Sequence, residues 1–281
     1  MMKSKRVAVV AALALVLALG LLGLPSTASA SGSGGTRFLG QICLFANTNS
    51  KVPAGWTPCD GRALPIGSNT ALFSVIGTVF GGNGSTFNLP DLRSAAPYSG
   101  TGGSGQYCMC TDGTAGVYTT FLIGEVCLLP DCVATSYTGL GPEIFLKCDG
   151  SAYDTADYSA LYGVIGGAFG SNLPNLADVS PLSGLSYYIA YNGNYPGSAM
   201  GDSDYTGAVN LYAFGTAPNG TLLPCDGRSL AIASNAAIYN VIGTAYGGSG
   251  SNFCIPDFRG MKPLPGLLYM IVTGGVYPSY Q

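Results

Sequence analysis

The sequence predicts an α+β protein, predominantly antiparallel β, in which three tandem repeats each contain one short α-helix. The glycine of a Cys-Asp-Gly turn is followed sixteen positions later by the glycine of an Ile-Gly pair, and this spacing occurs three times. Each copy lies between an apolar segment that suits a strand and a Tyr-containing segment that alternates in the pattern of a half-buried strand. The 43 glycines and 18 tyrosines, with only 9% charged residues, also suit a turn-rich β protein. A unit that recurs at one spacing indicates a repeat architecture.

The helix of each repeat is expected between the two glycines of this spacing, which are Gly61 and Gly77, Gly150 and Gly166, and Gly227 and Gly243. Residues that favour a helix N-cap occupy one repeat position, at Ser68, Asp157 and Ser234. In repeat one, Leu72, Val75 and Ile76 form an apolar stripe at i, i+3 and i+4. The second glycine of each pair is expected just after the last helical residue. A helix of about two turns is too short to be stable alone, so it must pack on a core.

Each repeat is expected to open and to close with a strand. The opening strands are predicted at Phe38–Phe45, Gly124–Leu129 and Gly207–Tyr212. The closing strands are predicted at Tyr107–Gly113, Tyr187–Gly193 and Tyr269–Gly275. Core positions three residues before each Cys-Asp-Gly turn are predicted at Trp56, Phe145 and Leu222. The glycine loop at residues 80–84 follows a helix and lacks Gly-Lys-Ser/Thr, so it is not expected to bind phosphate.

The N-terminus has the pattern of a secretory signal peptide. Lys3, Lys5 and Arg6 precede an apolar run from Val7 to Leu24, and Ala28-Ser29-Ala30 is a small-residue cleavage site. We expect residues 1–30 to be removed and the remainder to be secreted or held at the cell surface without a membrane span; an uncleaved anchor is the alternative. The predicted domains are residues 1–30 for the signal peptide and 31–118, 119–204 and 205–281 for repeats one, two and three.

Charge and composition exclude several classes of function. Removing residues 1–30 takes away three of the 11 basic residues and none of the 14 acidic ones, which leaves a formal charge of −6. Nucleic acid is not an expected partner of a chain without a basic patch. The chain has no histidine, which excludes His-based triads and His metal ligands. We predict no cofactor, no metal site and no catalytic residue.

The nine cysteines of an exported chain are expected to form disulfides. The predicted pairs are Cys43 with Cys59 and Cys127 with Cys148, because each joins the opening strand of a repeat to its Cys-Asp-Gly turn. Cys110 is an alternative partner of Cys59. The odd count leaves at least one thiol unpaired or intermolecular. Zinc is disfavoured, since no two Cys-x-x-Cys motifs are present.

Two turns of each outer repeat carry Asp and Arg together. Repeat two loses the second Asp and both Arg residues at once, with Ser151, Asn175 and Ala177 at those positions. This joint loss predicts one network of ion pairs and hydrogen bonds that holds the two turns together; binding of an anionic ligand is the alternative. The residues assigned to these structural turns are Cys59, Asp60, Gly61, Arg62, Asp91, Arg93, Cys148, Asp149, Gly150, Cys225, Asp226, Gly227, Arg228, Asp257 and Arg259.

Three segments of repeat one resemble the phage tail collar domain family. They are Gly-Gln-Ile-Cys-Leu-Phe (40–45), Pro-Ala-Gly-Trp-Thr-Pro-Cys-Asp-Gly-Arg (53–62) and Leu-Pro-Asp-Leu-Arg (89–93). This family includes short tail-fibre collars and microcystin-dependent proteins. Repeat three is similar from Ala208 to Pro278, and repeat two diverges. The resemblance implies a small, mostly antiparallel β fold with one short helix, used in phage as part of a trimeric fibre. The export signal and the three collars without a fibre shaft depart from that setting.

We therefore expect a secreted, non-enzymatic structural or adhesive surface protein of three collar-like modules. The modules are expected to form an intramolecular pseudo-threefold arrangement in place of a trimer. The alternatives are a subunit of an extracellular filament joined by strand addition, a carbohydrate-binding protein that uses exposed tyrosines, and a glycoside hydrolase. Self-association and a surface glycan are the expected partners. The carboxylate candidates for a hydrolase all lie in turns where Asp has a structural use, at Asp60, Asp91, Asp149, Asp226 and Asp257.

Overall fold

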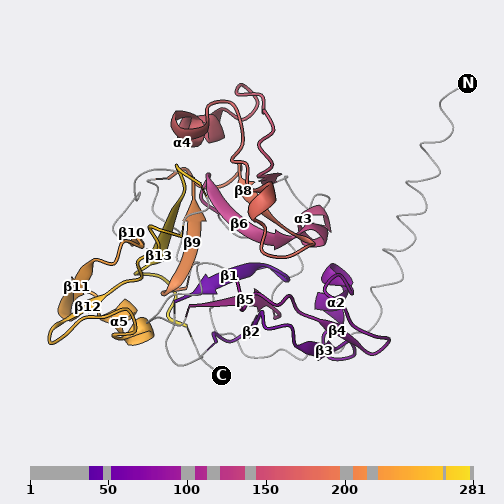
Figure 1. Cartoon of the computed structure of the whole chain (residues 1–281), viewed down its shortest axis with the longest axis horizontal. Helices are drawn as coiled ribbons and strands as arrows, with labels where there is room; N and C mark the ends of the chain where they lie inside the picture. The colour runs from indigo at the N-terminus through magenta and orange to yellow at the C-terminus, as the bar shows by residue number, and fades with distance from the viewer. Residues whose placement is uncertain are drawn as a thin grey trace, which may run out of the picture. The chain divides into compact units, whose positions relative to one another are not determined.

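One nine-stranded antiparallel sheet joins strands from all three repeats (Figure 1). The protein is described by a computed structural model that covers residues 38–46, 52–95, 105–112, 121–136, 144–196, 205–213, 221–261 and 264–278. These residues belong to one compact unit, Ser33–Gln281. The expected signal peptide, residues 1–30, lies outside the described residues. Within the described part of the chain, no helix is long and apolar enough to cross a membrane.

Each repeat contributes an opening strand, a closing strand beside it, and a short outer strand. In repeat one these are β1 (Ile42–Phe45), β5 (Gln106–Cys110) and β2 (Trp56–Pro58). In repeat two they are β6 (Glu125–Pro130), β8 (Leu185–Ala190) and β7 (Phe145–Lys147). In repeat three they are β9 (Ala208–Tyr212), β13 (Leu268–Val272) and β10 (Leu222–Pro224). The opening and closing strands, and the predominantly antiparallel β class, are confirmed.

Strand β9 links the three sets of strands into one sheet. One edge of β9 pairs with β13 of its own repeat, through residues 209–212. The other edge is shared, because Ala208 and Val209 pair with β1 while Leu211 and Tyr212 pair with β6. Contacts between residues far apart in the sequence therefore determine how the repeats meet.

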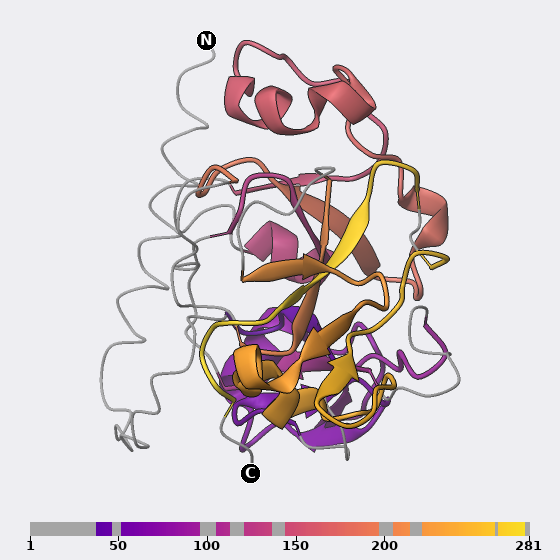
Figure 2. The same ribbon diagram turned by 90° about the vertical axis from the view of Figure 1, so that its left-hand side faces the viewer.

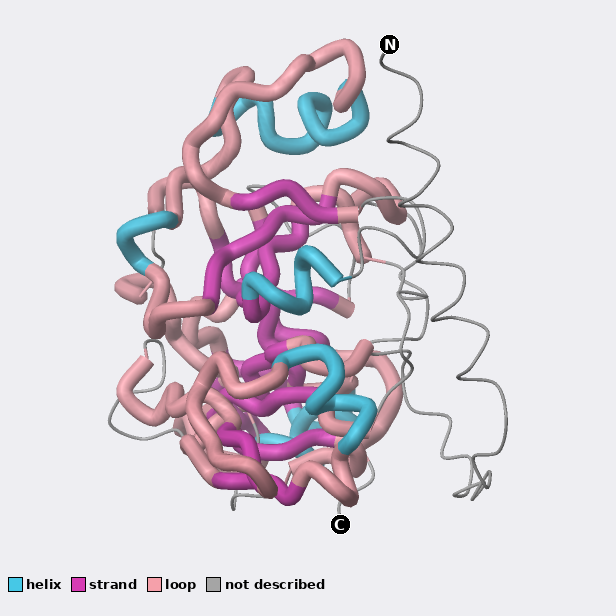
Figure 3. Tube along the Cα trace, turned by 90° about the vertical axis from the view of Figure 1, so that its right-hand side faces the viewer, coloured by secondary structure: helices cyan, strands magenta, loops and turns pink. Residues whose placement is uncertain are grey.

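The helices lie outside the strands (Figure 3). Each repeat has one main helix, α2 (Thr70–Ile76), α4 (Ser159–Phe169) and α5 (Ala236–Ile242), and Figure 1 shows the three at separate corners around the sheet. Their buried residues match the predicted stripe, for example Leu72 and Ile76 in α2. Shorter helices are α3 (Asp131–Ser136), η1 (Ala177–Val179) and η2 (Ile232–Ser234).

The helix ends agree with the sequence in part. Gly77 and Gly243 follow α2 and α5 with φ of 53° and 55°, which confirms the expected C-terminal glycines. The expectation for Gly166 is wrong, because α4 continues through it and ends before Gly170. In the outer repeats the chain must leave the helix early to form a two-stranded hairpin. Repeat two has a shorter connection and, over residues 144–196, no such hairpin, so its helix is one turn longer.

The predicted N-caps are wrong by one residue. The N-caps are Asn69, Tyr158 and Asn235, and none makes a side-chain capping bond. Instead, Nδ2 of Asn69 donates to the carbonyl oxygen of Pro65 at 2.9 Å. Nδ2 of Asn235 donates in the same way four residues back, at 3.0 Å. These amides stabilise the turn before the helix rather than the first helical N–H groups.

A two-stranded hairpin accompanies the helix in each of the two outer repeats. In repeat one it is formed by β3 (Ala63–Pro65) and β4 (Thr86–Asn88). In repeat three it is formed by β11 (Ser229–Ala231) and β12 (Asn252–Cys254). Over residues 144–196 of repeat two, a single bridge between Ala152 and Asn172 takes its place. The reason is length, since repeat two has eight residues from the Ile-Gly glycine to the proline and the outer repeats have thirteen.

The predicted disulfides, Cys43–Cys59 and Cys127–Cys148, are wrong in this fold. All nine cysteines lie in the described residues, and none is in a disulfide. Cys43 lies on β1 and Cys59 follows β2, but β5 runs between these strands. In repeat two, β8 separates Cys127 from Cys148 in the same way. Two strand spacings amount to about 9.6 Å, whereas a disulfide joins Cα atoms less than about 7 Å apart.

The large apolar residues before the Cys-Asp-Gly turns belong to the core. Trp56 is 7% exposed, and its ring lies edge-on to that of Phe45 with 5.1 Å between centroids. Leu222 is fully buried, and Phe145 is half-buried against Phe121. Trp56 is therefore a packing residue and presents no open ring face for a ligand.

The glycine loop after α2 brings its main chain directly against β4. Gly82 has φ of 140°, and a Cβ there would lie 2.5 Å from the carbonyl oxygen of Thr86 and 2.7 Å from the Cα of Phe87. Gly248 makes the same close approach in repeat three. A Cβ added at Gly84, by contrast, would have no atom within 4 Å apart from those of its chain neighbours. Gly82 therefore serves a close main-chain contact.

We expect Gly82→Ala to lower the free energy of unfolding by about 2 kcal/mol or more, since the new Cβ collides with main-chain atoms at a positive φ. Gly84→Ala is the matched control and should change the free energy by about 0.5 kcal/mol or less. Chemical denaturation of both variants measures the difference. Equal stability of the two variants would contradict the close contact.

Candidate functional site at the junction of the repeats

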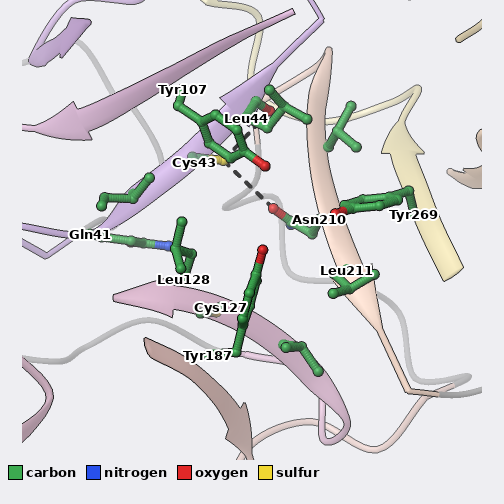
Figure 4. Close-up of a pocket in the computed structure, with 13 residues that line it drawn as sticks. Gln41, Cys43, Leu44, Tyr107, Cys127, Leu128, Tyr187, Asn210, Leu211 and Tyr269 are labelled. Carbon is green, nitrogen blue, oxygen red and sulfur yellow. Dashed lines mark hydrogen bonds between the residues drawn. The ribbon is translucent and has the colours of Figure 1, made fainter. Parts of the chain in front are cut away.

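Strands of all three repeats surround one cavity of about 40 Å³ (Figure 4). The middle residues of β1, β6 and β9 form its walls, and the closing strands add one tyrosine each. Most of the lining side chains occupy equivalent positions in the three repeats. They are Gln41, Ile42, Cys43, Leu44, Tyr107, Val126, Cys127, Leu128, Tyr187, Val209, Asn210, Leu211 and Tyr269.

Three tyrosines at one repeat position reach this cavity. Tyr107, Tyr187 and Tyr269 are each less than a tenth exposed. Each lies opposite a leucine of its opening strand, in one shared register. Figure 4 shows their hydroxyl groups pointing toward one another around Asn210.

Burial raises the pKa of all three phenols. The pKa of Tyr187 is raised to about 12, first by burial and then by the nearby Cys148. The pKa values of Tyr107 and Tyr269 are also raised, first by burial and then by the neighbouring phenols. At neutral pH the three hydroxyl groups therefore keep their protons. They act as hydrogen-bond donors and acceptors and not as bases.

The opening strands bring different polar groups to one repeat position of the junction. These are Cys43, Cys127 and Asn210. Sγ of Cys43 donates to Oδ1 of Asn210 at 3.6 Å. Sγ of Cys127 donates to Oε1 of the buried Glu125 at 4.0 Å, and Oε2 of Glu125 accepts the N–H of Leu122 at 3.2 Å. The equivalent positions thus pack alike but differ in their hydrogen bonds.

The Asp and Arg side chains of the outer repeats pair within each turn. Arg62 donates to Asp60 through Nε at 2.8 Å and Nη2 at 2.6 Å. Arg93 donates to Asp91 through Nε at 2.9 Å and Nη2 at 2.6 Å. Repeat three has the same pairs, Arg228 with Asp226 and Arg259 with Asp257. This differs from the single network expected, because each Asp is bound by the Arg two residues after it.

The main chain joins the two turns in every repeat. The N–H of Leu92 donates to the carbonyl oxygen of Cys59 at 2.8 Å, and in repeat three Phe258 donates to Cys225 at 2.8 Å. Repeat two has the equivalent bond, from Leu176 to Cys148, also at 2.8 Å. The turns therefore stay together without the Arg residues, because their link does not depend on these side chains.

The five carboxylates named as hydrolase candidates have lowered pKa values. The pKa values of Asp91 and Asp257 are lowered to about 2, first by hydrogen bonds from the Arg side chain of the same turn. The same cause comes first in lowering the pKa of Asp60 and Asp226. The pKa of Asp149 is lowered first by its hydrogen bond with the side chain of Ser151. These groups are ionised at neutral pH, whereas a general acid for glycoside hydrolysis requires a raised pKa.

The thiols of the Cys-Asp-Gly turns are not activated. Burial is the first cause that raises the pKa of Cys59, Cys148 and Cys225. A nucleophilic cysteine requires the opposite shift. Within the described ranges, no group of three or more Cys, Asp or Glu side chains is placed to hold a metal.

A second cavity, of about 220 Å³, lies beside the Cys-Asp-Gly turn of repeat three. Asp226 and Arg259 contribute to its wall. Both charges are already in ion pairs, with Arg228 and Asp257 respectively. The cavity therefore gives little support to the alternative that these turns bind an anionic ligand.

Sequence reasoning identified the strands of the junction but not its side chains. In the sequence, Tyr107, Tyr187 and Tyr269 are recognisable only as the first residues of the closing strands. The repeat itself holds the missing signal, because residues at one position of three modules meet if the modules pack around an axis. Gln41 and Glu125 share a position whose third member is Ala208, so no common residue type marks it.

A comparison with known protein families matches the phage tail collar domain three times, over residues 40–97, 129–181 and 207–263. No curated protein and no solved structure matches the chain. Each family match contains one Cys-Asp-Gly turn and one of the helices α2, α4 and α5. Together the matches cover more than half of the chain. The chain therefore belongs to the phage tail collar domain family, a structural domain of phage tails, and contains three tandem copies of it.

Proposed function

We propose that this chain is an exported, non-enzymatic structural and adhesive surface protein whose three collar modules pack as an intramolecular pseudo-trimer. Collar domains of tail fibres associate as oligomers, and here one chain supplies three copies. The modules are assigned to residues 31–118, 119–204 and 205–281, after a signal peptide at 1–30. The observation that supports the proposal most is the meeting of Tyr107, Tyr187 and Tyr269 at one cavity.

The arrangement of the sheet also supports the pseudo-trimer. Strand β9 pairs with β1 and with β6, so each repeat has a strand at the junction. The main helices lie away from it, and Figures 1 and 2 both place α4 far from α5. An inner junction with outward helices is the arrangement expected when three modules share one axis.

The outer strands favour separate particles over a filament formed by strand addition at these edges. β2, β7 and β10 are each three residues long and lie at the edges of the sheet. They end in Pro58, Lys147 and Pro224, residue types that discourage pairing with a further strand. Self-association, where it occurs, is assigned to other surfaces.

The chemistry of the turns supports a non-enzymatic role. The candidate carboxylates are held as anions by Arg or by turn bonds, and the buried turn thiols are protonated.

A surface glycan remains compatible as a partner, since Tyr162, Tyr195 and Tyr277 are each about half exposed. Exposed tyrosines offer rigid, amphipathic contact area to such a partner.

We expect the chain without residues 1–30 to unfold in one transition in scanning calorimetry, with calorimetric and van't Hoff enthalpies in a ratio of about 1. The reason is that the three repeats share one sheet. Leu44→Ala, at the junction, should destabilise the whole unit by about 2–5 kcal/mol without splitting the transition. Three separate transitions, of which Leu44→Ala shifts only one, would instead indicate independent modules.

Export and assembly can be measured on the secreted protein. We expect N-terminal sequencing to find Ser31 first, because cleavage after Ala30 removes the signal peptide. Light scattering should give the mass of one chain, because the junction closes within the chain. A mass of three chains would mean that the junction forms between chains, and a mature N-terminus at Met1 would overturn the predicted cleavage and favour the uncleaved anchor.

The Asp–Arg pairs predict a defined acid response. Arg93→Ala should raise the pKa of Asp91 from about 2 toward its usual 3.8, since the lost hydrogen bonds are the first cause of the shift. A lowered folded-state pKa adds stability that is present above pH 3.8 and lost as the pH falls toward about 2. The change in melting temperature should be a small decrease, because the pair is exposed.

Carboxyl NMR titration measures this shift. Asp149, which pairs with Ser151 and lies in another repeat, is the internal control and should keep its pKa. An unchanged Asp91 titration in Arg93→Ala would show that the ion pair is not formed in solution.

A further inference from the structure

The cavity at the repeat junction contains a buried acceptor that the protein does not satisfy. Gln41 is 2% exposed and lines the cavity (Figure 4). Its Oε1 accepts no hydrogen bond from any residue that the structure describes. A buried carbonyl oxygen without a hydrogen-bond donor is strongly disfavoured. We therefore expect a donor to this atom inside the cavity.

The chemistry of the walls selects a neutral partner. No charged side chain lines the cavity among the described residues. The phenols of Tyr107, Tyr187 and Tyr269 can both donate and accept, and the amide of Asn210 can do so as well. An anion would lack fixed cationic donors, and a cation would lack carboxylates. A small molecule that both donates and accepts hydrogen bonds fits all of these groups.

The volume restricts the partner to the size of water. The cavity measures about 40 Å³. One water requires about 10–15 Å³ of such space, whereas a cavity that binds benzene is about 150 Å³. A sugar ring or an aromatic molecule is therefore too large, and room remains for roughly one to three waters.

We propose that the junction of the three repeats is an internal hydration site in which ordered water donates to Oε1 of Gln41 and bonds the hydroxyl groups of Tyr107, Tyr187 and Tyr269, the axial tyrosines. This inference rests on the pseudo-threefold packing proposed above. The water links groups of different repeats, Gln41 from the first, Tyr187 from the second and Asn210 from the third. It completes a polar junction that the side chains alone leave incomplete.

The test is a high-resolution crystal structure of the mature chain and of Gln41→Met, which keeps the length of the side chain but removes the acceptor. We expect density for water within hydrogen-bond distance of Oε1 of Gln41 and of at least one axial tyrosine hydroxyl. Gln41→Met should lose that water. Gln106→Met is the control, since Oε1 of Gln106 is also buried without a partner among the described residues but lies off this cavity; it should leave the axial water in place.

The outcomes separate this inference from the proposed function. A junction in which the three tyrosines meet around a dry cavity would overturn the hydration site alone, as would water that stays unchanged in Gln41→Met. Tyrosines that do not meet would overturn the pseudo-trimer as well. If Gln41→Met fails to fold, Tyr187→Phe replaces it, and oxygen-17 relaxation dispersion in solution should count fewer long-lived internal waters in that variant than in the parent chain. An equal count would contradict the proposal.

Discussion

The sharing of one β9 edge between β1 and β6 is the constraint on which the rest of the structure depends. Alternate residues of a strand face opposite sides, so a slip of one residue in either pairing reverses the faces of a whole strand. Such a slip would turn the leucine and cysteine positions of that repeat away from their equivalents. The tyrosines meet only because all three repeats keep the same offset between opening and closing strands. The register of the strands at the junction is therefore more tightly constrained than the sequence of the outer parts of the repeats.

Because one chain supplies all three repeats, equivalent positions at the junction can carry different side chains. In a trimer of identical chains, every group near the axis is present three times. Here Asn210 stands where the other repeats have cysteine, and Glu125 aligns with Gln41 and Ala208. Three buried carboxylates at the position of Glu125 would repel one another and lose hydration, whereas a single one accepts the N–H of Leu122 and is tolerated. Duplication followed by divergence thus permits a polar, asymmetric centre that identical subunits cannot form.

The sequence predicted features that depend on neighbours in the chain. The spacing of the turns identified three modules and their helices, and Gly77 and Gly243 marked two helix ends correctly. Sheet order is not a local property, and nothing near Cys43 or Cys59 indicates that β5 runs between their strands. The disulfide prediction failed for that reason. The side chains of the junction were missed for the same reason, because they come together only through pairings between distant strands.

Repeat two shows which parts of the module are necessary. It lacks the Arg residues of the turns and the outer hairpin, yet it keeps Tyr187, the positive φ of Gly150 and the main-chain bond from Leu176 to Cys148. A Cβ on Gly150 would lie 3.0 Å from the side chain of Asn175, so this glycine allows the two turns to approach. The retained features are the main-chain link between the two turns and the junction, and the lost ones are the exposed Arg side chains and the outer hairpin. Because main-chain bonds link the two turns in every repeat, the outer surface of the module can diverge while the fold stays the same.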